Sequence, residues 1–365
     1  MKKRRPHHHA YEIAPSPAAV ALDVMSDPPV VTVFEYNAQT CIEKTLSFAE
    51  AIAYTPPSDA KLWLNVHGVH DADLITKIGE KFKLHPLVIE DILNVEQRPK
   101  LDTFEDYLFL EVNCFYYDHE TLSISAEQIS LVLDKNYVLT FQVRSTGIFE
   151  PLRERLRKEK SQMRSLNVDY LAYAVLDTVV DSYFGVLDGM ADDCEALENA
   201  LLARPSNKEL HDLHQLKHAS IELRRSVWPL REVINHLTRN ENDFVSRQTL
   251  PYMRDVYDHT VHFIESLEAQ RDILAGMMDI YLSSVSQRVN LELRALTVVA
   301  MLFMPATLIA GIFGMNFNHI PWIEDYNGFW YALAIMAGIA LLMIMIFWRR
   351  QWINRSTFSI RKGDD

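Results

Sequence analysis

A stripe of uncharged residues near the C-terminus could guide a hydrated ion without any ionised side chain. They recur three or four residues apart and therefore share one face of a helix; they are Asn290, Leu293, Thr297, Ala300, Met304, Thr307 and Gly311. Three polar or small members, Thr297, Thr307 and Gly311, interrupt a strongly apolar run. Such a stripe could line a path for a hydrated ion. It could also be a contact face, because membrane helices pack through small and hydroxyl residues.

Asparagines stand at both ends of the same predicted helix. Asn290 lies at the inner end and Asn316 at the outer end, and either side chain would be costly if it faced lipid. The two asparagines therefore favour the path over the contact face. Acids recur every seven residues on another face, ending at Asp279; the earlier ones are Asp258, Glu265 and Asp272. They fit either a solvated face or a pore entrance at Asp279.

Two windows without charge could hold the stripe inside a membrane. Residues 296–313 and 328–348 contain 18 and 21 uncharged residues, and a helix needs roughly 20 to cross the hydrocarbon. Arginines precede the first window and follow the second, whereas the loop at 314–327 has no Lys or Arg. Because excess positive charge stays in the cytoplasm, the sequence predicts a multi-pass protein of the cell (inner) membrane with both termini cytoplasmic.

One long helix is expected to carry the stripe. Between Pro251 and Pro305 the chain has no proline and a single glycine, Gly276, so a stalk helix at 249–313 could continue into the first span over about 90 Å. Apolar residues recur every seven along it and predict a packing seam; they are Leu267, Leu274 and Tyr281. Two spanning helices cannot enclose an aqueous path. A path therefore requires a ring of identical subunits.

The rest of the chain is expected to be water-soluble. Strand-like runs alternate with a helical stretch over 31–165, which predicts a mixed α/β domain. The runs are 30–36, 61–68, 107–117 and 129–143, and the turn Asp134-Lys135-Asn136 within the last run predicts a hairpin. Residues 166–248 predict an antiparallel helix pair. Residues 1–30 have no apolar periodicity and are interpreted as a mobile tail, and 349–365 as a basic cytoplasmic tail.

Composition limits the classes of partner and of chemistry. A net charge of -13 argues against a nucleic acid, whose phosphates require a basic surface, and suits cations. Three distant cysteines without a CxxC pair predict neither a disulfide framework nor a thiolate zinc site. The chain has no GxSxG, GxGxxG or Walker loop. We therefore predict that it is not an enzyme, and a membrane-anchored α/β enzyme is the less favoured alternative.

A short motif makes a family resemblance specific. Gly314-Met315-Asn316 directly follows the first uncharged window. With the segments HPLVIEDILN, QRPK, WPLREV, LPYMRDVYDHT and DIYLSSVS, it resembles the CorA family of divalent-cation channels over about residues 60 to 350. The resemblance implies a funnel-shaped homopentamer with an α/β cytosolic domain, a long stalk helix and two transmembrane helices. It also implies Mg²⁺ as the transported ion, with Co²⁺ and Ni²⁺ as further ions.

The same resemblance implies that Gly314, Met315 and Asn316 form the selectivity filter at the outer mouth. Mg²⁺ gives up its water shell reluctantly and prefers oxygen ligands in octahedral order. A ring of neutral carboxamide oxygens would hold such a hydrated ion without trapping it. The family's outer loop usually carries an acid soon after the motif, whereas here the loop acids are displaced to Glu324 and Asp325. The sequence therefore leaves undecided whether the acids of this outer loop capture cations at the mouth.

A regulatory metal site is also implied by the resemblance. It would consist of Asp91 and Asp255, with Glu90 and Asp177 as nearby acids, between adjacent subunits. Carboxylates so placed repel one another unless a cation lies among them. Cytosolic Mg²⁺ bound there would keep the ring closed. The zinc-transporting branch of the superfamily stays the alternative, because sequence separates the transported ions only weakly.

Overall fold

The computed structural model describes residues 28–57, 59–95, 97–203, 205–239, 243–315, 321–322 and 325–350. Most of the predicted N-terminal tail, Asn316 and nearly all of the basic C-terminal tail lie outside these ranges. The chain divides into two compact units, which are residues 1–200 with 206–277 and residues 201–205 with 278–365. The first unit contains a β-sheet with its covering helices, and the second contains the most apolar helical segments.

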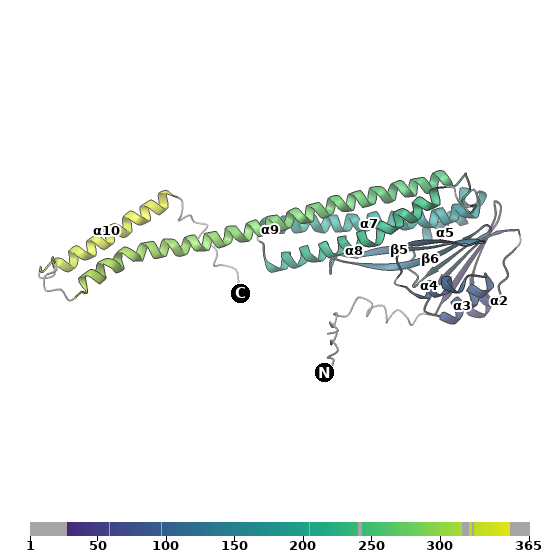
Figure 1. Cartoon of the computed structure of the whole chain (residues 1–365), viewed down its shortest axis with the longest axis horizontal. Helices are drawn as coiled ribbons and strands as arrows, with labels where there is room; N and C mark the ends of the chain where they lie inside the picture. Colours follow the sequence, from purple (N-terminus) through teal and green to yellow (C-terminus); the bar gives the residue numbers. More distant parts are fainter. Residues whose placement is uncertain are drawn as a thin grey trace, which may run out of the picture. The chain divides into compact units, whose positions relative to one another are not determined.

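A seven-stranded sheet forms the centre of the first unit (Figure 1). Its strands are β1 (Val30–Tyr36), β2 (Cys41–Leu46), β3 (Lys61–His67), β4 (Lys100–Thr103), β5 (Tyr107–Asp118), β6 (Ser123–Asp134) and β7 (Tyr137–Gln142). They lie in the order β2-β1-β3-β7-β6-β5-β4. The β3–β7 pair is parallel and the other neighbouring pairs are antiparallel. The turn after Asp134 closes the β6–β7 hairpin that the sequence predicts.

Helices cover both faces of this sheet. The helices that begin in the first unit are α2 (Phe48–Ala53), α3 (Ala72–Lys81), α4 (Pro86–Leu93), α5 (Glu150–Arg157), α6 (Gln162–Ser165), α7 (Val168–Ala203), α8 (Asn207–Thr238) and α9 (Leu250–Phe313). In Figure 1, α2, α3 and α4 lie on one side of the sheet and α5 and α7 on the other. The break between α7 and α8 is sharp because Ser206 and Glu209 form a capping box that starts α8.

Alternation along the strands gives the sheet two apolar faces. Val33, Leu64 and Phe109 belong to a first core together with buried residues of α3 and α4. Phe34 and Trp63 belong to a second core, which extends through α5, α7, α8 and the first part of α9. The predicted ranges 31–165 and 166–248 therefore share this second core.

The first part of α9 joins the second core through a seam with a seven-residue repeat. The buried seam residues are Met253, Val256, Thr260, Phe263, Leu267, Gln270, Leu274 and Met277. Against α7, the ring centroids of Phe263 and Tyr183 lie 5.4 Å apart, and Gln270 Nε2 lies 3.6 Å from Cys194 Sγ. The seam therefore fixes which face of α9 the protein interior covers.

A single helix, α9, runs unbroken from Leu250 to Phe313. Of the predicted seam residues, Leu267 and Leu274 are buried and Tyr281 is half-buried. The acids that recur every seven residues up to Asp279 are all exposed in the described chain. They lie on a face of α9 that the seam does not use.

The second unit contains the end of α9 and α10 (Gly328–Arg349). Among the described residues three helices, α7, α9 and α10, are long and apolar enough to cross a membrane. In α7, 67% of the most apolar window is buried inside the protein, against 0% in α9 and 6% in α10. Exposed apolar surface of this extent is unusual in a soluble protein and suits contact with lipid.

Polar side chains form a ladder on the second-core face of the parallel pair β3 and β7. Asn65 Nδ2 donates to Thr140 Oγ1 at 2.9 Å and to Gln142 Oε1 at 3.2 Å. His67 Nε2 lies 3.1 Å from Gln142 Oε1. Burial, together with the positive charge of Arg153, lowers the pKa of His67 to about 4. The imidazole therefore stays neutral at neutral pH.

This neutral ring should make part of the stability depend on pH. An unfolded histidine has a pKa of about 6.5. Below about pH 6.5, residue 67 therefore binds a proton in the unfolded chain but stays unprotonated in the folded chain. The contribution of His67 is complete above about pH 6.5 and is lost as the pH falls toward about 4. His67→Gln should flatten the fall of the unfolding temperature of the full chain over this range.

A matched control is His211→Gln, which removes an exposed histidine from α8. The acid-induced fall in unfolding temperature should be the same in this variant as in the parent. An unchanged slope in His67→Gln would contradict the assignment of a buried neutral ring.

Candidate functional site

The predicted path-lining stripe lies on an exposed face of α9 in the second unit. Every member from Asn290 to Gly311 is exposed in the described chain. An open groove of about 660 Å³ follows this face; it is lined by Ala300, Phe303, Met304, Thr307, Leu308, Gly311, Ile312 and Met315. Four of these residues belong to the predicted stripe.

Another face of α9 packs against α10. A pocket of about 320 Å³ lies between the two helices, and α9 contributes Ile309, Ala310 and Phe313 to its lining. Leu302 is also half-buried, whereas Met304 is 68% exposed. The groove and the α10 contact share no lining residue. The stripe therefore faces away from α10 and is left for another partner or for solvent.

The hydroxyl groups of the two threonines in the stripe donate hydrogen bonds to carbonyl oxygens of their own helix. Thr297 Oγ1 donates to Leu293 O at 2.7 Å, and Thr307 Oγ1 donates to Phe303 O at 2.9 Å. Such bonds to the preceding turn allow a hydroxyl to lie in apolar surroundings. The oxygens keep lone pairs that can accept from water. The two threonines are thus compatible with a contact face and with a path.

The outer end of α9 tightens at the predicted filter motif. Gly314 N donates to Ala310 O at 2.9 Å, and Met315 N donates to Ile312 O at 3.2 Å. A Cβ on Gly314 would approach Ala310 O to 3.2 Å, which is closer than ordinary contact. Glycine therefore favours the tight end of this helix. Asn316, the third residue of the motif, lies outside the described residues.

Two of the predicted regulatory acids lie on α4 in the first unit. Glu90 is exposed and Asp91 is half-buried. Asp91 is paired within its own chain, because Lys100 Nζ lies 2.6 Å from Asp91 Oδ2. Two further carboxylates surround the same ammonium group, with Asp102 Oδ2 at 3.8 Å and Glu111 Oε2 at 4.0 Å. Asp91 is therefore part of a cluster of three acids and one lysine.

Glu111 is the buried member of this cluster. Its side chain is 1% exposed, and Gln128 Nε2 donates to its Oε1 at 3.1 Å. Burial raises the pKa of Glu111 to about 8, although the positive charge of Lys100 acts in the opposite direction. One ammonium group shared among three acids offsets little of the free-energy cost of burying an ionised carboxyl group.

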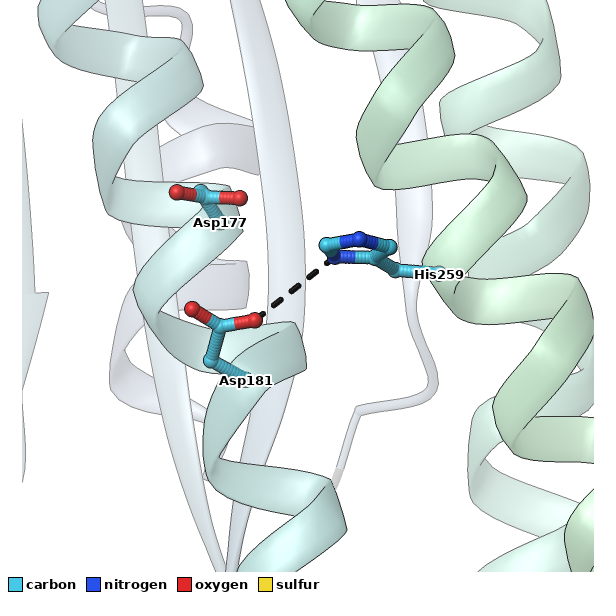
Figure 2. A group of neighbouring side chains, drawn as sticks. All are labelled: Asp177, Asp181 and His259. Atoms are coloured by element: carbon cyan, nitrogen blue, oxygen red, sulfur yellow. Dashed lines mark ion pairs between the residues drawn. The ribbon is translucent and has the colours of Figure 1, made fainter.

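The other predicted acids contribute to a second cluster. Asp177, Asp181 and His259 each offer a ligand atom within 4.8 Å of the others. Figure 2 shows the two aspartates on α7 and the histidine on α9 pointing toward one another. His259 Nδ1 lies 3.7 Å from Asp181 Oδ1, and Asp255 Oδ2 lies 4.0 Å from His259 Nε2. Burial and the charge of Asp181 raise the pKa of Asp177.

The two clusters lie on opposite faces of the sheet within one chain. Asp91 adjoins Ile92, which belongs to the first core, and Asp255 adjoins Val256, which belongs to the second. The structure thus brings Asp177 near Asp255 through His259, and it does not bring Asp91 to either of them. A site that uses Asp91 and Asp255 together would need a second copy of the chain.

Sequence reasoning missed five residues of these clusters, namely Lys100, Asp102, Glu111, Asp181 and His259. Asp181 and His259 each follow a predicted acid by four residues on a helix, the spacing that brings side chains together. That signal was available in the sequence. Lys100 reaches Asp91 only through the pairing of β4 with β5, and no local pattern indicates it.

Comparison with known proteins places the chain in a family. The sequence profile described as CorA-like Mg²⁺ transporter protein matches residues 58–350, which is most of the chain. The chain belongs to the CorA family. The cobalt/magnesium transport protein CorA of Thermotoga maritima is 41% identical over 323 residues, covering 88% of this chain and 92% of that protein. The putative metal ion transporter YfjQ of Bacillus subtilis is 28% identical over 298 residues.

Solved structures support the CorA fold. The complete structure of the CorA magnesium transporter from Methanocaldococcus jannaschii matches with a TM-score of 0.74 at 21% identity, over 90% of this chain and 99% of that one. The zinc-related alternative is more distant, since a ZntB cytoplasmic domain from Vibrio parahaemolyticus matches with a TM-score of 0.54 at 14% identity. The predicted α/β domain with long helices is therefore confirmed.

The CorA relatives are transporters, which confirms the prediction that this chain is a transport protein and not an enzyme. The α/β sheet consequently has to be explained as a part of a transporter. Its acidic clusters are candidates for binding the cations that such a protein meets.

Proposed function

We propose that this chain forms a channel for divalent cations in which α9 lines the path and α10 faces lipid. The exposed groove on α9 carries this proposal, because Thr307 and Gly311 line it and do not line the pocket against α10. By contrast, α10 has no Ser, Thr, Asn or Gln and offers no polar stripe. The burial of α7 supports two spanning helices rather than three.

The path would be enclosed by a ring of identical subunits. One α9 and one α10 cannot surround water, so the stripe of each copy has to meet the stripes of others around an axis. The CorA resemblance implies five copies. The arginines that flank the two spans support a cytoplasmic position for both termini in the inner membrane. The exposed acids near Asp279 would then line the cytosolic entrance.

Mg²⁺ is the proposed physiological ion, with Co²⁺ and Ni²⁺ also carried. The name of the Thermotoga maritima relative includes both cobalt and magnesium. The motif Gly314, Met315 and Asn316 would hold the hydrated ion through neutral oxygens. Neutral donors suit a channel, because each ion has to leave the filter as readily as it enters.

Cytosolic Mg²⁺ would also regulate the channel by binding between subunits. Asp91 of one copy and Asp255 of the next are the proposed ligands, with Glu90 and Asp177 nearby. Their carboxylate oxygens are the donors that Mg²⁺ prefers. The separation of Asp91 and Asp255 onto opposite faces of one chain supports a site between copies rather than within one.

Ion flux into liposomes tests the filter. Asn316→Ala or Asn316→Asp should reduce Mg²⁺ uptake by about tenfold or more, because each subunit loses a neutral donor to the hydrated ion. Asn318→Ala removes a carboxamide just outside the motif and should leave uptake close to that of the parent. Parent-like uptake by either Asn316 variant would refute the filter. Faster flux of Zn²⁺ than of Mg²⁺ through the parent would favour the zinc-transporter alternative.

The rotation of α9 can be tested with two serine substitutions. Met304 is the bulkiest apolar residue of the stripe at membrane depth, so a ring of its side chains could close the path by excluding water. Met304→Ser should wet this constriction and raise the basal leak at high Mg²⁺ several-fold. Leu302→Ser, at a half-buried position outside the stripe, should instead lower the yield of folded protein. Equal leak through both variants would show that α9 is rotated differently.

A further inference from the structure

Lys100 is held in place by the sheet and is surrounded by acids. The β4–β5 register puts Lys100 directly opposite Glu111, and Asp102 follows two residues later on the same strand. The ammonium lies over the Phe109 ring, 5.7 Å from its centroid. Its side chain is 30% exposed, so it keeps some freedom to move between the three carboxylates.

The distances from the Lys100 ammonium to Asp91 and to Glu111 show which carboxyl group it pairs with. Its contact with Asp91 at 2.6 Å is a short ion pair, whereas its separation from Glu111 at 4.0 Å is too long for a hydrogen bond. Glu111 Oε2 is buried and has no hydrogen-bond partner among the described residues. A buried carboxylate oxygen without a donor is costly, and a donor 4.0 Å away could meet it after a small shift.

We propose that Lys100 is a built-in competitor of divalent cations at Asp91, with Glu111 as the position to which its ammonium withdraws. In the metal-free chain the ammonium neutralises Asp91. A cation that binds Asp91 displaces the ammonium, which then satisfies the free oxygen of Glu111. The inference rests on the proposed role of Asp91 as a regulatory ligand, and adds the residue that sets the cation concentration at which that site fills.

The competition follows from charge alone. Bringing Mg²⁺ to a carboxylate that already holds an ammonium at 2.6 Å requires breaking that ion pair or tolerating the repulsion between the two cations. The free-energy cost of breaking the Lys100–Asp91 ion pair is reduced if a second carboxyl group then accepts the ammonium. Removal of Lys100 should therefore tighten cation binding, and removal of the Glu111 carboxyl oxygens, which can accept the ammonium, should weaken it.

Limited proteolysis of the full-length protein in detergent measures this effect, with the Mg²⁺ concentration for half-maximal protection as the readout. Lys100→Met should lower that concentration about three- to tenfold, given the modest strength of partly exposed ion pairs. Lys100→Arg keeps the charge and should stay close to the parent. Glu111→Met removes both carboxyl oxygens and should move the concentration in the opposite direction.

Two controls separate competition from other causes. Arg98→Met removes an exposed positive charge two residues before Lys100 and should shift the midpoint less than about twofold, as expected for a screened surface charge. Unfolding temperatures without Mg²⁺ identify any variant that fails to fold. If Lys100→Met fails in this way, Lys100→Gln and the opposite shift in Glu111→Met still decide the question.

The outcomes distinguish this inference from the proposed function. If Asp91→Ala abolishes the protection and Lys100→Met leaves the midpoint unchanged, the regulatory site stands and the competitor is overturned. If Arg98→Met shifts the midpoint as much as Lys100→Met, general electrostatics replaces the specific role of Lys100. If Asp91→Ala leaves the protection of the parent intact, both the site and its competitor fail, while the flux measurements still test the channel.

Discussion

A helix that leaves a protein core and continues into lipid has to keep every backbone hydrogen bond within itself, because hydrocarbon offers no substitute partner. The helix α9 meets this constraint over its 64 residues. Its first part is held by a buried seam, and its last part exposes apolar side chains and two threonines bonded to their own helix. Pro305 is the exception within this stretch, since it cannot donate. The groove and the α10 contact both depend on that continuity.

Acidic side chains gather at several places in the described part of the first unit. They lie on α4, on α7 and along α9, and one ammonium group, that of Lys100, has three carboxylates within 4.0 Å. Near Asp177, His259 and Arg155 oppose the rise in its pKa that burial and Asp181 cause. Such acids repel one another less when a cation lies among them. In the proposed channel, the transported cations would reach this surface.

Most of the fold followed from periodicity, and the failures have physical causes. The strands β1, β3, β5, β6 and β7 were predictable because their buried residues are β-branched, aromatic or long apolar side chains. The strands β2 and β4 were missed, since CIEKTL and KLDT lie at the two edges of the sheet and have few buried residues. The stripe on α9 was predictable from helical spacing, and its exposure agrees with that spacing. The pairing of Lys100 with Asp91 depends on strand register, which no local pattern encodes.

Asp91 and Asp255 lie on opposite faces of one sheet, so the proposed regulatory site could use both for one Mg²⁺ only where two chains meet. A lone subunit presents each carboxylate to water singly and would bind Mg²⁺ as weakly as any surface acid. If the pair closes only between neighbours, the free energy of metal binding is shared with that of association, and each equilibrium shifts the other by the same factor. Metal scarcity would then loosen the ring itself. The same two carboxylates would then both sense Mg²⁺ and hold neighbouring subunits together reversibly. A newly made subunit would respond to the ion only after it had joined others.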